Sequence, residues 1–64
     1  MVKINGELLL ADGKNVLEIL IELGYLENRV AVELNEQIVP KAKYSETVLK
    51  DGDCVEVVRF VGGG

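Results

Sequence analysis

Hydrophobic and polar residues alternate over residues 2–10, a period that is typical of strands with one buried face. The alternation is interrupted at Asn5 and Gly6. An Asn-Gly pair supplies the two positive-φ residues that a type I′ turn requires. The sequence therefore predicts an antiparallel hairpin, with strands at residues 2–5 and 7–10.

A helical period replaces the alternation from residue 16 onward, with apolar residues at i, i+3, i+4 and i+7. This spacing gathers side chains on one helix face, so four of them are expected in the core: Val16, Ile19, Leu20 and Leu23. Leu17 and Ile21 lie beside this stripe, and two interpretations of them stay open. They form either the edge of the core or a partly exposed apolar patch for a partner.

The predicted helix has recognisable end signals. Asn15 suits the N-cap position, and Glu18 three residues later completes a capping box. Gly24 is expected to end the helix, because glycine readily adopts the left-handed conformation that follows a C-cap.

Residues 30–34 alternate cleanly and predict a third strand. Its buried face is expected to carry Val30, Val32 and Leu34. Residues 35–37 are typical of a turn.

Ile38 and Val39 predict a short extended segment that ends at Pro40. Proline has no backbone N–H to donate to a ladder, so this segment is expected at an edge of the sheet. Residues 41–48 are polar and irregular, with room for one helical turn and with Tyr44 as an anchor in the core.

Residues 54–61 predict the last strand. Val55 and Val57 are expected to face the core, which places Val58 and Phe60 on the outward face. A docking surface is one explanation of an outward Val and Phe, and packing at the edge of the core is the other.

The predicted order is strand, strand, helix, strand, short strand and last strand. One helix on one face of a mixed sheet of four to five strands belongs to the α+β class. The order resembles that of the ubiquitin-like β-grasp fold, in which the last strand is inserted centrally.

Composition narrows the range of partners. The 64 residues include 7 basic and 11 acidic side chains, a net charge of −4, and the basic ones are scattered, so nucleic acid is not expected to bind. With Cys54 as the single cysteine and no histidine, neither an internal disulfide nor a common metal site is expected. Met1 to Leu10 lacks the apolar block of a signal peptide, and no apolar run is long enough to span a membrane. We therefore expect a cytosolic, cytoplasmic protein without membrane contact.

The three glycines Gly62, Gly63 and Gly64 follow Val61. Because ordering glycine costs the most conformational entropy, residues 62–64 are expected to be a flexible tail carrying the α-carboxylate of Gly64, after a domain at residues 1–61. A frayed terminus and a linker scar are the alternative explanations.

Several short motifs carry a resemblance to a known family. They are Ile4-Asn5-Gly6, Val32-Glu33-Leu34-Asn35, Ile38-Val39-Pro40-Lys41, Asp51-Gly52-Asp53 and Phe60-Val61-Gly62-Gly63-Gly64, with Tyr44 where the family has an aromatic residue. With these motifs the chain resembles, over essentially its whole length, the ThiS-type sulfur carriers of thiamine biosynthesis, which are ubiquitin-like β-grasp proteins.

The resemblance implies a carrier and co-substrate without catalytic side chains and without a bound cofactor. It implies that a ThiF-type adenylating enzyme, using ATP and Mg²⁺, joins the carboxylate of Gly64 to AMP. Sulfur from a cysteine desulfurase then gives a thiocarboxylate, which donates its sulfur to a ThiG-type thiazole synthase. Gly62 and Gly63 are expected to thread the partner's active site. The expected docking surface consists of Val58, Arg59, Phe60 and Val61.

Two alternative functions stay open: the small subunit of a molybdopterin synthase, which also carries a thiocarboxylate, and a ubiquitin-like interaction module that does not use its terminus. Asp51, Asp53 and Glu56 are interpreted as solvated charge rather than as a catalytic carboxylate pair. Cys54 is interpreted as a small strand residue that packs as a hydrophobe, with bonding to a partner as the alternative.

Overall fold

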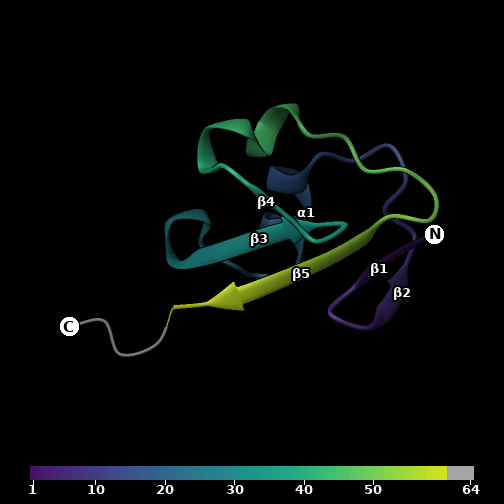
Figure 1. Cartoon of the computed structure of the whole chain (residues 1–64), viewed down its shortest axis with the longest axis horizontal. Helices are drawn as coiled ribbons and strands as arrows, with labels where there is room; N and C mark the ends of the chain where they lie inside the picture. The colour runs from purple at the N-terminus through teal and green to yellow at the C-terminus, as the bar shows by residue number, and fades with distance from the viewer. Residues whose placement is uncertain (61–64) are drawn as a thin grey trace.

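The structure is a computed structural model, and it describes residues 1–60. Five strands form one mixed sheet in the order β2-β1-β5-β3-β4, and Figure 1 shows β5 crossing its middle. β5 (Cys54–Arg59) pairs in parallel with β1 (Val2–Ile4) and antiparallel with β3 (Val30–Leu34). The central placement of the last strand confirms the predicted β-grasp architecture.

Two hairpins with two-residue turns flank β5. β1 pairs with β2 (Glu7–Leu9) through the predicted turn, where Asn5 and Gly6 have φ values of 51° and 85°. β3 pairs with β4 (Gln37–Val39) through Asn35 and Glu36, whose φ values of 51° and 70° define a second type I′ turn. Gln37 therefore lies in the strand rather than in the predicted turn, and β4 is at the sheet edge as predicted.

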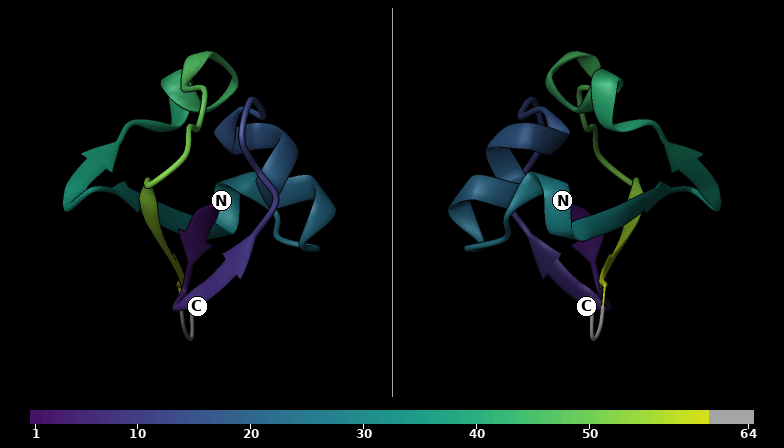
Figure 2. Two further views of the ribbon diagram at one scale, coloured as in Figure 1. Left: turned by 90° about the vertical axis from the view of Figure 1, so that its right-hand side faces the viewer. Right: turned by 90° about the vertical axis from the view of Figure 1, so that its left-hand side faces the viewer.

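Helix α1 (Val16–Glu22) lies on one side of the curved sheet, as both views of Figure 2 show. The capping box is present: Glu18 N–H donates to Asn15 Oδ1 at 2.8 Å, and Asn15 N–H donates to Glu18 Oε1 at 2.9 Å. At the other end, Gly24 N–H donates to the carbonyl of Ile21 and Tyr25 N–H to that of Leu20, which is a Schellman motif. The predicted helix start and stop are both confirmed.

The prediction that Leu23 lies in the core is wrong. Leu23 is the C-cap residue and is exposed, whereas Val16, Ile19 and Leu20 are buried. The chain leaves the helical path at Gly24, whose φ is +82°. Leu23 therefore belongs to the closing turn of the helix, where the 3.6-residue period no longer sets the direction of its side chain.

Two 3₁₀ helices complete the fold. η1 (Glu27–Arg29) leads into β3, and η2 (Lys41–Glu46) follows Pro40 and brings Tyr44 into the core, where it is 3% exposed. Burial, with a smaller contribution from the charge of Glu27, raises the pKa of the Tyr44 phenol. The helical turn and the anchoring role of Tyr44 are as predicted.

The core lies between α1 and the inner face of the sheet. It contains Val55 and Val57 from β5, as predicted, together with valines and isoleucines of β1, β3 and α1. The opposite face of the sheet is open, and the outward residues of β5 lie on it. β5 is shorter than predicted, since it ends at Arg59 instead of residue 61.

Candidate functional site

The end of β5 brings the predicted docking residues to the surface. Val58 is 59% exposed and Phe60 is 63% exposed. Figure 1 shows that this end of β5 projects past the β1–β2 hairpin, on the side of the molecule away from Met1. The remaining predicted site residues lie outside the described part of the chain: Val61, Gly62, Gly63 and Gly64.

The open face beside Val58 is apolar at one end and acidic in the middle. Val58 lies opposite the half-buried Ala31 of β3. In the next row Glu33 lies between Glu56 of β5 and the exposed Ile38 of β4. Like charges in such a pair repel each other, so a basic group brought against this row would be favoured.

A groove of about 270 Å³ borders this face. Phe60, Ile38, Ala31 and Pro40 are among the residues that line it. It lies where β4 ends at Val39, because the chain then turns away from β3 into η2. The apolar surface around Phe60 therefore continues from β5 to the edge of the sheet.

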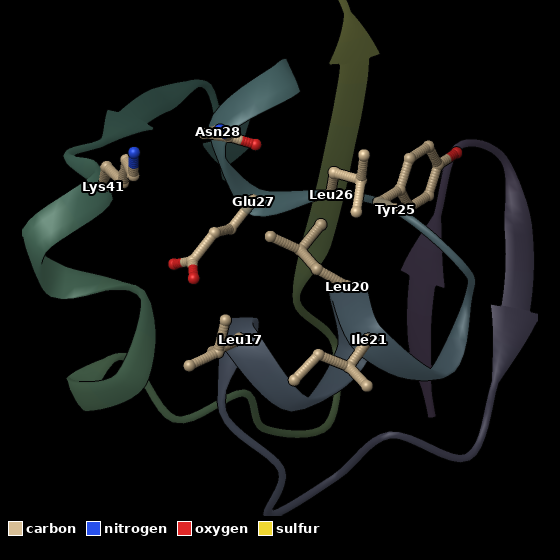
Figure 3. Close-up of a pocket in the computed structure, with 8 residues that line it drawn as sticks. All are labelled: Leu17, Leu20, Ile21, Tyr25, Leu26, Glu27, Asn28 and Lys41. Atoms are coloured by element: carbon tan, nitrogen blue, oxygen red, sulfur yellow. The ribbon is translucent and has the colours of Figure 1, made fainter.

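A second groove, of about 410 Å³, lies on the helix side of the sheet (Figure 3). Its lining consists of Leu17, Leu20, Ile21, Tyr25, Leu26, Glu27, Asn28 and Lys41. Leu17 packs against the core, as the edge-of-core interpretation holds, whereas Ile21 is 67% exposed. The two residues that the sequence treats together thus have different environments.

Arg59 and two residues that the sequence reasoning did not select form a contact network at the end of β5. The guanidinium carbon of Arg59 lies 4.7 Å from the centre of the Tyr25 ring. Asn5 Nδ2 donates to the Tyr25 hydroxyl at 3.2 Å, and Asn5 Oδ1 accepts from Val57 N–H at 2.7 Å. The Asn-Gly turn signal located Asn5, but nothing local in the sequence indicates its bond to β5, 52 residues away.

The three acidic residues near β5 have separate roles. Asp51 binds the N-terminal ammonium, and Glu56 is exposed on the open face. Asp53 is only 6% exposed: it accepts from Asn35 Nδ2 at 3.1 Å and from Lys50 N–H at 3.0 Å. The interpretation of Asp53 as solvated charge is therefore wrong, because its carboxylate closes the turn before β5 from inside the fold.

Cys54 is exposed on the open face of the sheet. It is a strand residue, as expected, but it does not pack as a hydrophobe. Within residues 1–60, no group of three or more Cys, Asp or Glu side chains is arranged to hold a metal ion. Over the same residues, no helix is both long and apolar enough to cross a bilayer.

Comparison with known proteins identifies the family. The family model for the ThiS family matches residues 1–64. The chain belongs to the ThiS family. Among curated relatives, the sulfur carrier protein ThiS of Thermus thermophilus is 42% identical over 64 residues, which cover 100% of both chains.

Solved ThiS structures have the same fold. The crystal structure of the thiamine biosynthesis protein ThiS from Geobacter metallireducens superposes with a TM-score of 0.78 at 36% identity, over 98% of this chain and 97% of that one. This match confirms the ubiquitin-like β-grasp fold beyond the element order.

Longer relatives also contain this domain. The thiazole synthase of Paramagnetospirillum magneticum is 45% identical over 62 residues, which are 95% of this chain but 19% of that protein. The thiazole synthase of Magnetococcus marinus is 41% identical over 64 residues, which are 98% of this chain and 20% of that protein. The chain thus spans about a fifth of the length of these thiazole synthases.

Proposed function

We propose that this protein is a sulfur carrier of thiamine biosynthesis and that Gly64 carries the sulfur. The observation that carries the proposal is the match over 100% of both chains to a curated sulfur carrier protein, in a family whose model covers residues 1–64. In this role the chain is a carrier and co-substrate, and the catalytic side chains belong to its partners.

The chemistry starts from a carboxylate, which is a poor electrophile because its negative charge repels a nucleophile. An oxygen of the Gly64 carboxylate attacks the α-phosphorus of ATP in a Mg²⁺-dependent adenylating enzyme, and pyrophosphate leaves. The terminal sulfur of a cysteine desulfurase persulfide then attacks the acyl carbon, and AMP leaves. A thiol cleaves the resulting S–S bond and releases the thiocarboxylate. Gly62 and Gly63 suit a narrow partner channel because they have no side chains.

Two classes of partner follow from this proposal. One is a ThiF-type adenylating enzyme, and the other is a thiazole synthase, which receives the sulfur. The thiazole synthases that contain a matching domain support the second partner, since a covalent connection keeps two cooperating domains at high effective concentration.

We propose Val58, Phe60 and Val61 as docking residues, together with Ile38 and Ala31 on the same open face. The exposure of Val58, Phe60 and Ile38 supports this surface, because clustered exposed apolar side chains mark interaction sites. The adjacent pair Glu33 and Glu56 favours a partner surface with positive charge beside its apolar centre.

The experiment is intact-mass measurement after incubation with ATP, Mg²⁺ and a ThiF-type enzyme, with and without a sulfur donor. The expected products are the protein with one added AMP and, with sulfur, the protein with one oxygen exchanged for sulfur. A variant lacking Gly64 and a variant with one residue added after it should give neither product, and both should unfold at the wild-type temperature.

The outcomes separate the alternatives. No mass change with an enzyme proven active would support an interaction module instead. Sulfur accepted by a large molybdopterin-synthase subunit, but not by a thiazole synthase, would support the molybdopterin alternative. An extended variant that is still sulfurated at its new end would contradict the positioning of Gly64.

A further inference from the structure

The pairing of β5 changes along its length. Cys54 pairs with β1, and Val55 pairs with β1 on one side and with β3 on the other. β1 ends at Ile4, so the later residues of β5 have β3 on one side only. This is the part of β5 that leads toward residues 61–64.

The direction of the backbone groups shows where support is missing. Phe60 N–H donates to the Arg29 carbonyl at 2.9 Å, so the backbone groups of Phe60 point toward the β3 side. Successive residues of a strand direct these groups to opposite sides, so those of Val57 and Arg59 point to the β1 side. Among residues 1–60, no strand lies there beyond Ile4.

Side chains replace the missing strand at this position. Asn5 N–H donates to the Val55 carbonyl at 2.9 Å, and Asn5 Oδ1 then accepts from Val57 N–H at 2.7 Å. The Asn5 amide thereby extends the ladder by one bond past the end of β1. Its Nδ2 is held by the Tyr25 hydroxyl, and the Tyr25 ring holds the Arg59 guanidinium.

We propose that Asn5, Tyr25 and Arg59 form an exit clamp that positions the end of β5 for transfer chemistry at Gly64. The residues come from three segments: the β1–β2 turn, the loop after α1, and β5 itself. They are positioning residues, because the proposed role of each is to hold the end of β5 rather than to act on the carboxylate. The inference rests on the proposed sulfur-carrier function.

The physical effect is on conformational entropy. A partner must hold the chain end in one geometry, and every strand residue that it also has to fix lowers the equilibrium constant by a factor of about 5 to 30. With the clamp, the backbone is already held through Arg59. Without it, the partner also has to order the end of β5.

The step at which the partner orders the strand end determines which kinetic parameter changes. Docking of the body through Val58 and Phe60 sets the KM for the carrier, whereas ordering of the strand end is required only to reach the productive complex. Loss of the clamp should therefore lower kcat and leave KM unchanged, whereas loss of a docking side chain should raise KM.

Asn5→Gly tests the clamp without straining the turn, because glycine adopts the φ of 51° that Asn5 has. It removes both amide contacts. Asn5→Asp is the rescue variant, because one carboxylate oxygen still accepts from Val57 N–H and the other accepts from the Tyr25 hydroxyl. Tyr25→Phe keeps the ring beneath Arg59 and removes only the hydroxyl.

Asn35→Gly is the matched control. Asn35 has the same φ of 51° in the other type I′ turn, and it accepts from Cys54 N–H at the opposite end of β5. It is not adjacent to the proposed exit. Any loss of kcat that merely reflects weaker folding should appear in this variant as well.

Two measurements decide the question. Steady-state adenylation by a ThiF-type enzyme should show kcat lowered about tenfold in Asn5→Gly, partly lowered in Tyr25→Phe and restored in Asn5→Asp, with KM unchanged and Asn35→Gly at the wild-type kcat. Amide relaxation should show order parameters of about 0.85 at Arg59 and Phe60 in the wild type and clearly lower values in Asn5→Gly.

An Asn5→Gly protein with wild-type kcat would overturn the exit clamp, as would an equal loss of kcat in Asn35→Gly. If the wild type itself is not adenylated, the proposed function fails and the kinetic role of the clamp fails with it. The order parameters then still decide whether Asn5 holds the end of β5.

Discussion

Asn35 and Asn5 hold the two ends of β5 in the same way but in different surroundings. Each lies in a type I′ turn with φ of 51°, and each side chain accepts from a backbone N–H of β5. At the entry end, the amide of Asn35 donates to the buried carboxylate of Asp53. At the exit end, the amide of Asn5 donates to the half-buried Tyr25 at the surface.

The difference teaches how one local device serves two purposes. A hydrogen bond to a buried charge is strong, and breaking it leaves that charge unsatisfied, so the entry end contributes mainly to stability. The bond between Asn5 and Tyr25 is neutral and exposed, so it contributes less, because water replaces a lost partner there. Substitutions at the exit end should therefore change the free energy of unfolding little. The contacts there matter mainly because they set the direction in which the chain leaves β5.

The largest effect is expected for Asp53→Ala. The substitution leaves Asn35 Nδ2 and Lys50 N–H without their carboxylate acceptor in a nearly buried site. We expect a loss of about 2–4 kcal/mol in the free energy of unfolding, measured by urea denaturation. Asp51→Ala, which changes an exposed carboxylate two residues away, is the control. Equal losses in the two variants would contradict a special role for the entry end.

The next largest effect is expected at the exit end, where a substitution should weaken binding to the partner more than it lowers stability. Phe60→Ala removes an exposed ring from the proposed docking surface. We expect KM for the adenylating enzyme to rise about tenfold, which corresponds to about 1.4 kcal/mol, with a change in unfolding free energy below about 1 kcal/mol. Leu10→Ala, at an exposed apolar residue outside this surface, should change neither quantity. A main effect on unfolding would place Phe60 in the core.

A direct contrast of the two asparagines should give a smaller difference. Asn35→Gly is expected to cost about 1–2 kcal/mol of stability, because Asp53 loses a partner, and Asn5→Gly about 0.5–1 kcal/mol. Thermal and urea unfolding of both variants in one buffer measure this difference. If Asn5→Gly were the more destabilising of the two, the exit end would be a structural element rather than a positioning one.

Local rules explain what the sequence predicted correctly. The Asn5-Gly6 turn, the capping box of Asn15 and Glu18, and the stop at Gly24 depend on residues a few positions apart. Leu23 was misassigned because the helical period was continued one residue too far into the closing turn.

The missed features are non-local. The buried state of Asp53 depends on Asn35, 18 residues away, and the exit clamp joins Asn5 to Tyr25 and Val57, 20 and 52 residues away. Predicting such contacts requires the order of the strands in space, which the order of elements along the chain does not determine. The exposed Val58 and Phe60 were predictable because strand alternation alone sets their side.

The smallest effect is expected from the ion pair at the entry end and should depend on pH. The pKa of the Asp51 carboxyl is lowered by its hydrogen bond to the N-terminal ammonium and then by the charge of that ammonium. The pKa of the ammonium is raised by its hydrogen bond to Asp51 and more weakly by that to Asp12, against the opposing effect of burial. The Asp51 contribution is therefore present above the unfolded pKa of about 3.9 and is lost as pH falls through the lower folded value. The ammonium contribution is present below about pH 8 and is lost as pH rises through the raised folded value.

The measurement compares the unfolding midpoints of the wild type and Asp51→Asn between pH 2 and pH 10, approximately the range that spans both groups. The difference should be small, because both groups are exposed, largest between about pH 4 and pH 8, and reduced by added salt. For Asn5→Gly, by contrast, the difference from the wild type should stay constant across the acid limb, since the Asn5 amide does not titrate. An acid-dependent difference in Asn5→Gly would mean that the two ends of β5 are coupled and do not act separately.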